Sequence, residues 1–194
     1  NFEHKSIPNL INKGNRLVFS KQQEAKIEEM RKILLPHRDK RVHPYKDDKI
    51  LTSWNGLAIA ALSYAGRVFD DIKLIKSAIN AADFILSEMI DNKGRLLSRY
   101  REGDAAYKGY LDDYSYLVWG LIELYEAVFD NKYLETAIKL NDDMIRLFED
   151  IEGGGFYLYG NDSEKMISRP KESYDGALPS GNSAASMNLL RLSR

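Results

Sequence analysis

The chain has 194 residues, of which 44% are hydrophobic and 29% charged, and its formal net charge is −1 at pH 7. This balance is typical of a globular protein, and the lack of a basic run argues against nucleic acid as a partner. The sequence holds neither a run of 18 apolar residues nor a cysteine, so we expect no membrane-spanning helix and no thiolate chemistry. Its first residues do not resemble a signal peptide, and we expect a cytoplasmic location.

The N-terminal 19 residues lack an evident core of their own. They contain Pro8, Gly14 and one short apolar run, so we expect residues 1–19 to be the tail of an upstream segment. Residues 20–194 are expected to form the domain. The last helical pattern stops at Arg194 without a cap, which predicts that the domain is truncated at its C-terminus.

The first predicted helix begins after Ser20, because Ser20 and Gln23 have the spacing of a capping box. Pro36 is expected to end this helix near Leu35. Its apolar positions form one stripe along a charged surface, which predicts an outer, half-solvated helix. The stripe consists of Ala25, Ile27, Met30, Ile33 and Leu34.

A charged connector, residues 37–49, leads to the first strongly apolar helix. We expect His37 and His43 in this connector to be solvated, so the sequence predicts no metal site. The helix over residues 53–68 is apolar nearly all round, which predicts that it is buried. The helix over residues 72–90 has one apolar side and is expected to be an outer, half-exposed helix.

The same pairing of a buried and an outer helix recurs further along the chain. Tyr114 follows Trp54 by 60 residues, and each opens an apolar helix after a polar cap. Helices over residues 113–128 and 131–148 repeat the scheme, and Asn182 opens a third copy. An internal repeat of helix pairs predicts an all-α fold in which inner helices are wrapped by outer ones.

Two short β segments interrupt the helices. Residues 95–100 alternate as a strand does, and residues 156–159 and 165–168 flank a turn, which predicts a β-hairpin. The glycine run before that hairpin lacks the lysine and serine or threonine of a phosphate-binding loop. We therefore expect no cofactor.

Asp112 and Asp113 stand together at the mouth of the central apolar helix. One explanation is structural, because carboxylates cap free N–H groups and meet the positive end of the helix dipole. The other is chemical, because the same pair can move protons or bind sugar hydroxyls. The sequence leaves both explanations open.

Four ordered motifs, residues 47–57, 109–114, 169–172 and 175–183, span the helical repeats. Together they resemble the thioredoxin-domain-containing family that includes the bacterial YyaL-type proteins and the animal spermatogenesis-associated protein 20. The resemblance implies an N-terminal thioredoxin-like domain joined to an (α/α)₆ toroid similar to N-acylglucosamine 2-epimerases and six-hairpin glycosidases. This chain matches only part of the toroid. The implied partners are therefore the rest of the toroid and the thioredoxin-like domain, and bare apolar faces predict self-association.

In toroids of this kind the openings of the inner helices face a funnel that holds sugars, which implies candidate residues here. The candidate catalytic residues are Asp112, Asp113, Glu172 and Asp175. The candidate ligand-binding residues are Asp48, Trp54, Asn55, Tyr114, Arg169, Lys171, Ser180 and Asn182. The alternative is structural, with polar residues as helix caps or loop-pinning pairs and the tryptophan in the core. We expect one polar pocket bounded by Trp54, Asp112, Tyr114, Arg169 and Glu172.

Two functions follow from this set. The first is a non-catalytic binding or regulatory module for a sugar or another small polar ligand. The second is a carbohydrate-active enzyme, either a glycoside hydrolase with two facing carboxyls or a sugar isomerase or epimerase. Epimerases of similar fold use paired histidines, and His4, His37 and His43 lie on none of the predicted inner helices. The sequence therefore favours the binding module.

Overall fold

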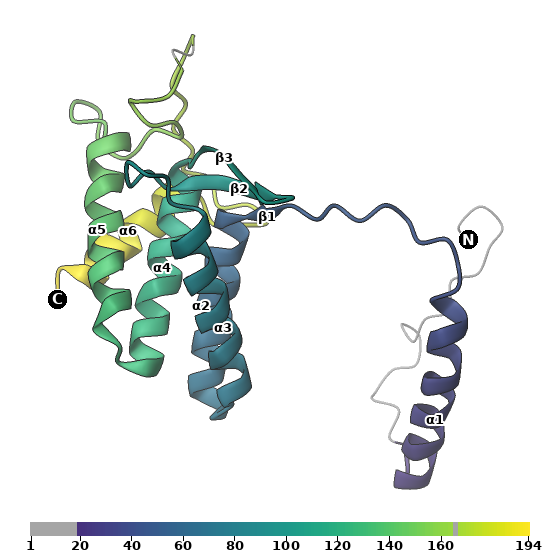
Figure 1. Ribbon diagram of the computed structural model, residues 1–194. Coiled ribbons are helices and arrows are strands. Elements are labelled where there is room, and N and C mark those ends of the chain that lie inside the picture. Colours follow the sequence, from purple (N-terminus) through teal and green to yellow (C-terminus); the bar gives the residue numbers. More distant parts are fainter. Residues whose placement is uncertain (1–18, 165–166) are drawn as a thin grey trace. The chain divides into compact units, whose positions relative to one another are not determined.

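The computed structural model describes residues 19–164 and 167–194 (Figure 1). The chain divides into two compact units, Asn1–Asp47 and Asp48–Arg194. The domain predicted over residues 20–194 therefore takes in part of the first unit. The predicted tail, apart from its last residue, lies outside the described residues.

The first unit contains helix α1 (Lys21–Arg38). The predicted capping box is present, since the Gln23 N–H donates to Ser20 Oγ at 3.3 Å and the Ser20 N–H donates to Gln23 Oε1 at 2.9 Å. The predicted end at Leu35 is wrong, because α1 continues through Pro36 for two more residues. A proline this close to the C-terminus removes a single backbone donor, and the last turn still closes.

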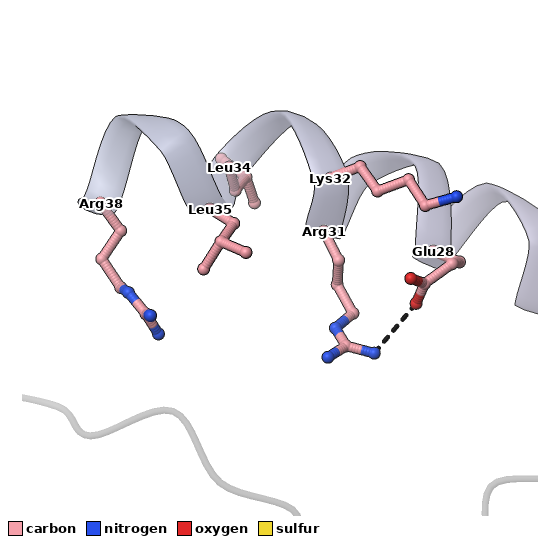
Figure 2. Close-up of a pocket in the computed structure, with 6 residues that line it drawn as sticks. All are labelled: Glu28, Arg31, Lys32, Leu34, Leu35 and Arg38. Atoms are coloured by element: carbon pink, nitrogen blue, oxygen red, sulfur yellow. Dashed lines mark hydrogen bonds and ion pairs between the residues drawn. The ribbon is translucent and has the colours of Figure 1, made fainter. Parts of the chain in front are cut away.

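The apolar stripe of α1 is exposed rather than half-solvated. Ile33 and Leu34 are 58% and 64% exposed, and no residue of α1 is buried among the described parts of the chain. Figure 2 shows the side chains beside a hollow along this helix, which are Glu28, Arg31, Lys32, Leu34, Leu35 and Arg38. All six come from one helix, and Arg31 and Glu28 form an ion pair of 2.9 Å. The hollow is therefore a charged helix surface rather than an enclosed cavity.

Five helices build the second unit: α2 (Thr52–Phe69), α3 (Ile72–Glu88), α4 (Leu111–Val128), α5 (Asn131–Phe148) and α6 (Gly181–Leu192). Helix α4 is the central one and contacts the other four (Figure 1). Most of its residues are buried, as predicted for the central helix. The predicted all-α fold with a small β component is confirmed. No helix in the described ranges has the length and apolar character needed to cross a membrane.

Helices α2 and α4 cross with their backbones in contact. A Cβ atom on Gly120 would lie 2.7 Å from the carbonyl oxygen of Gly56, and one on Gly56 would lie 2.6 Å from the Leu117 nitrogen. Only glycine allows an approach this close. The other side of α2 is exposed in the described structure, with Tyr64 at 54%. The prediction that α2 is buried all round is therefore wrong.

A three-stranded antiparallel sheet lies where α2 and α4 begin (Figure 1). Its strands, in order, are β1 (Ile50–Leu51), β2 (Leu97–Arg101) and β3 (Asp104–Lys108). The predicted strand is present as β2, whereas the sequence of β3 carries no strand pattern. Glu102 and Gly103 both have positive φ and form the tight turn between the two strands.

The hairpin predicted over residues 156–168 is wrong for the residues that the structure describes. Phe156 forms one isolated bridge, and the Asn182 side chain bonds its N–H and C=O groups at 2.7 and 2.9 Å. The Leu158 N–H donates to the Pro170 carbonyl at 2.8 Å. Backbone groups that are satisfied in this way are no longer open to a strand partner. Part of the predicted second strand lies outside the described residues.

Candidate functional site

A cavity of about 210 Å³ lies at the end of the second unit where α2 and α4 begin. Its walls come from the start of α2, strand β2, the start of α4 and the segment that follows α5. The lining residues are Ser53, Ser98, Tyr110, Asp112, Asp113, Leu158 and Tyr159. This lining combines carboxylates and hydroxyls with aromatic rings, a mixture suited to a small polar ligand.

Asp113 caps two helices at once. Its Oδ1 accepts from the Ser53 N–H of α2 and its Oδ2 accepts from the Tyr110 N–H of α4, each at 2.9 Å. Helix α2 has no side-chain cap of its own, because its N-cap residue is Leu51. Tyr110 is the N-cap of α4, so Asp113 occupies the third helical position rather than the cap. The structural explanation of Asp113 is thus the one that the geometry supports.

Burial raises the pKa of Asp113 to about 6, because the side chain is 1% exposed and the charged form loses hydration. The hydrogen bonds from Tyr110, Ser98 and Ser53 act in the opposite direction. Desolvation outweighs them. The group is therefore a carboxyl whose charge is costly in the folded state.

Asp112 accepts a hydrogen bond from the Gly181 N–H at the start of α6, and it also lines the cavity. Burial is the largest cause that raises its pKa, the negative charge of Glu172 adds to the effect, and the Gly181 N–H opposes it. A Cβ atom at Gly181 would overlap Asp112 Oδ1. Glycine at this position is what lets the helix start approach the carboxylate.

The Tyr116 hydroxyl is affected by carboxylates from two places, the start of α4 and the segment before α6. Its hydroxyl donates to the Pro179 carbonyl. Burial, followed by the charges of Asp112, Asp175 and Glu172, raises its pKa to about 12. Three of the four candidate catalytic residues therefore act on one hydroxyl.

Asp175 and Ser180 hold the start of α6. The Asp175 Oδ1 accepts from the Ser180 N–H at 2.8 Å, and this bond lowers the pKa of Asp175. Ser180 is the N-cap of α6 and accepts from the Ser183 N–H at 3.1 Å. Both residues serve the helix start, and neither lines the cavity.

Tyr114 is a core residue and not part of the cavity wall. It is 0% exposed, and its hydroxyl accepts from Arg95 Nη1 at 2.7 Å and from the Leu96 N–H at 3.1 Å. Arg95 also binds the Gly109 carbonyl at 3.0 Å and Asp162 at 3.1 Å. The prediction that Tyr114 contacts a ligand is corrected, because this network uses its hydroxyl and covers its ring.

Three other ligand-binding candidates lie near the start of α2 but outside the cavity lining. Trp54 is 63% exposed, so the alternative of a core tryptophan is wrong. The Asn55 side chain donates to the Leu51 carbonyl at 2.8 Å. Asp48 forms an ion pair of 2.8 Å with Arg101.

The remaining candidates brace the segment between α5 and α6. Lys171 Nζ lies 2.6 Å from Asp150 Oδ2, and Asn182 binds the backbone of Phe156. Arg169 donates to the Tyr159 carbonyl at 2.8 Å. Arg169 thereby positions a wall of the cavity. Of the five residues predicted to bound one pocket, Asp112 alone lines this cavity.

Sequence reasoning missed several of the lining residues. Tyr110 belongs to the motif around the two aspartates and could have been included. Ser98 and Tyr159 carry no local signal, because each reaches the cavity through long-range folding of a strand or loop. The Tyr110 and Tyr159 rings meet edge to face with centroids 5.4 Å apart. In the described parts of the chain, no three His, Cys, Asp or Glu side chains gather as metal ligands would.

These observations define the class: a helical-hairpin repeat protein with an acidic cavity at the openings of its inner helices. No protein-family profile matches the chain. Cellobiose 2-epimerase from Bacillus thermoamylovorans has a similar fold, with a TM-score of 0.62 and 19% identity, over 77% of this chain and 41% of that one. A family 105 glycoside hydrolase from C. acetobutylicum also has a similar fold, with a TM-score of 0.60 and 16% identity, over 87% of this chain and 52% of that one. The chain is therefore part of an (α/α)₆ toroid.

Sequence comparison identifies curated relatives of the chain. The chain is 36% identical over 171 residues to human spermatogenesis-associated protein 20, and 33% identical over 174 residues to an uncharacterized protein of Caenorhabditis elegans. These matches cover 82% and 86% of the chain. The chain spans 22% and 24% of the length of these two relatives. It thus resembles a part of spermatogenesis-associated protein 20, which confirms the resemblance inferred from the motifs.

Proposed function

We propose that the cavity binds a single sugar residue or a polyol of that size, and that the chain is a ligand-binding module. The observation that carries this proposal is the lining, in which Asp112, Ser53 and Ser98 offer oxygens while Tyr110 and Tyr159 offer ring surfaces. Carboxylate and hydroxyl oxygens accept from sugar hydroxyls, and aromatic rings pack against the apolar faces of sugar rings.

The size of the cavity supports a small ligand. Its volume of about 210 Å³ is below the roughly 300–1,000 Å³ of pockets that take drug-sized molecules. Sugar epimerases and glycoside hydrolases share the fold, which is consistent with a carbohydrate. By the resemblance to the longer family, the module would act in the cytoplasm beside the rest of a toroid and a thioredoxin-like domain.

Calorimetric or NMR titration of the full chain with a panel of neutral monosaccharides tests the proposal. We expect saturable binding by at least one of them. Replacing Tyr159 by alanine should weaken that binding by about two- to tenfold, the range that one aromatic contact supplies. Tyr64→Ala is the matched control, because Tyr64 is exposed on α2 and does not line the cavity. Absence of binding across the panel would refute the proposal.

A second function, glycoside hydrolysis, has one observation in its favour. The pKa of Asp112 is raised, and the charge of Glu172 is one of its causes, so these two carboxyls act on each other. Hydrolases set one carboxyl as acid and another as base or nucleophile in this way. If the chain is such an enzyme, Asp112→Asn should abolish turnover and leave the fold intact, whereas Asp142→Asn, at an exposed position of α5, should change neither.

A further inference from the structure

The cavity lining carries negative charge without a compensating cation. Asp112 and Asp113 both line it, and none of its described lining residues is a lysine, arginine or histidine. No cation is among the groups that shift the pKa of either aspartate. Backbone N–H groups of Ser53, Tyr110 and Gly181 are the partners instead.

Other carboxylates add negative charge at the same end of the second unit. Glu172 raises the pKa of Asp112, and Glu172, Asp175 and Asp112 all act on the hydroxyl of Tyr116. A ligand in the cavity therefore meets a negative potential.

The lysine and arginine side chains of the neighbouring segments contact other groups and not the cavity aspartates. Lys171 binds Asp150 at 2.6 Å, and Lys108 and Arg95 both bind Asp162, at 3.2 and 3.1 Å. Arg169, whose guanidinium donates to the Tyr159 carbonyl, also lies 4.0 Å from the centre of the Tyr157 ring. These contacts hold the loop that walls the cavity.

We propose that the cavity prefers an amine-bearing sugar over a neutral sugar and rejects sugars that carry a carboxylate. This inference rests on the proposed sugar-binding function and names the substrate class within it. An ammonium group gains from Asp112 and Asp113, which both line the cavity, while a uronate would bring a third negative charge beside them with no arginine or lysine of the lining to receive it.

Titration of the full chain with D-glucosamine, D-glucose and D-glucuronate at neutral pH and low salt tests this preference. The three probes share one ring and differ in charge. We expect glucosamine to bind about tenfold tighter than glucose, as one charge interaction near a protein surface can supply, and glucuronate to bind most weakly. Added salt should narrow the difference between glucosamine and glucose and leave glucose affinity nearly constant.

Two charge-removing variants test whether negative charge near the cavity causes the preference for glucosamine. Glu172→Gln removes an exposed charge that does not line the cavity, so it should reduce the ratio of glucosamine affinity to glucose affinity. Asp142→Asn on α5 is the matched control and should preserve the order. Glucuronate binding that equals or exceeds glucose binding would overturn the inference but leave sugar binding standing. Failure of all three probes to bind would overturn both.

Discussion

Helix α4 packs against α2 and α6 and carries carboxylates near both of its ends, where the groups that contact these carboxylates differ. Where these helices begin, Asp113 and Asp112 are met by backbone N–H groups. Where they end, Glu126 lies 2.5 Å from Arg67 and 2.6 Å from Arg191. Glu123 completes the second group, 2.7 Å from Arg191.

The pKa shifts follow this difference. Hydrogen bonding to Arg67 is the main cause that lowers the pKa of Glu126, whereas burial raises the pKa of both Asp112 and Asp113. Guanidinium groups neutralise the charge at one end, while N–H dipoles at the other end orient the carboxylates without cancelling them. The end whose carboxylates are paired with arginine is suited to holding helices together, and the end where Asp112 and Asp113 have no arginine partner is the one available to a ligand.

The largest expected effect comes from removing the shared cap. Asp113→Ala leaves the Ser53 and Tyr110 N–H groups without their acceptor, so both α2 and α4 lose a cap. We expect a loss of about 2–4 kcal/mol in the free energy of unfolding, at roughly 1–2 kcal/mol for each helix. Urea denaturation measures it. The exposed Asp142→Ala is the control, and a loss for Asp113→Ala no larger than for this control would contradict the two-helix cap.

The ionisation of Asp113 should make the free energy of unfolding depend on pH. Its folded pKa of about 6 lies above the ordinary value of 3.8, so the folded state binds more protons between these values. Stability from this group is therefore present below about pH 4 and lost as pH rises toward 6, by at most about 3 kcal/mol.

The test compares the wild type with Asp113→Asn, which cannot titrate at this position. Asp162 and Asp175 have lowered pKa values and destabilise both proteins alike at low pH, so the difference between the two curves isolates Asp113. The advantage of the wild type should shrink from pH 4 to pH 6. A constant difference over that interval would show that Asp113 titrates normally.

At the end where α4 and α6 finish, Arg191→Ala should lower the free energy of unfolding by about 1–3 kcal/mol. This range is below the 3–5 kcal/mol of a fully buried pair, because Arg191 is 24% exposed and Arg67 still holds both glutamates. Added salt should weaken the contribution of Arg191 to the free energy of unfolding and not that of Asp113, because Arg191 acts through ion pairs and Asp113 through backbone N–H groups. Arg146→Ala, at an exposed position of α5, is the matched control. Equal salt sensitivity at the two ends would contradict the contrast between them.

The smallest effect concerns the titration of Asp112 alone. Glu172→Gln removes a negative charge that adds to the rise in the pKa of Asp112, so that pKa should fall while the free energy of unfolding stays within about 0.5 kcal/mol of wild type. Carbon-13 NMR of the aspartate carboxyls measures it. An unchanged Asp112 titration would place Glu172 too far away to act on the cavity.

The sequence by itself determined the helix repeat and its borders. Helix α5 has the predicted bounds with Asp130 as its N-cap, and α1 begins with the predicted capping box. Local rules suffice for these features, because caps and apolar periodicity involve residues a few positions apart. The site at the openings of the inner helices stays a prediction.

Only the tertiary structure decided which residues do what at that site. Asp112 and Asp113 are neighbours in sequence, yet one reaches α6 and the other binds α2, since successive helical positions point about 100° apart. Tyr114 faces the core and Tyr159 faces the cavity because of where Arg95 and the loop after α5 fold. Contacts between residues 45 to 67 positions apart, such as Ser53 with Asp113 and Arg95 with Asp162, have no local signature. They arise when the whole core packs, and they are what turns a pair of aspartates into one cap and one open carboxylate.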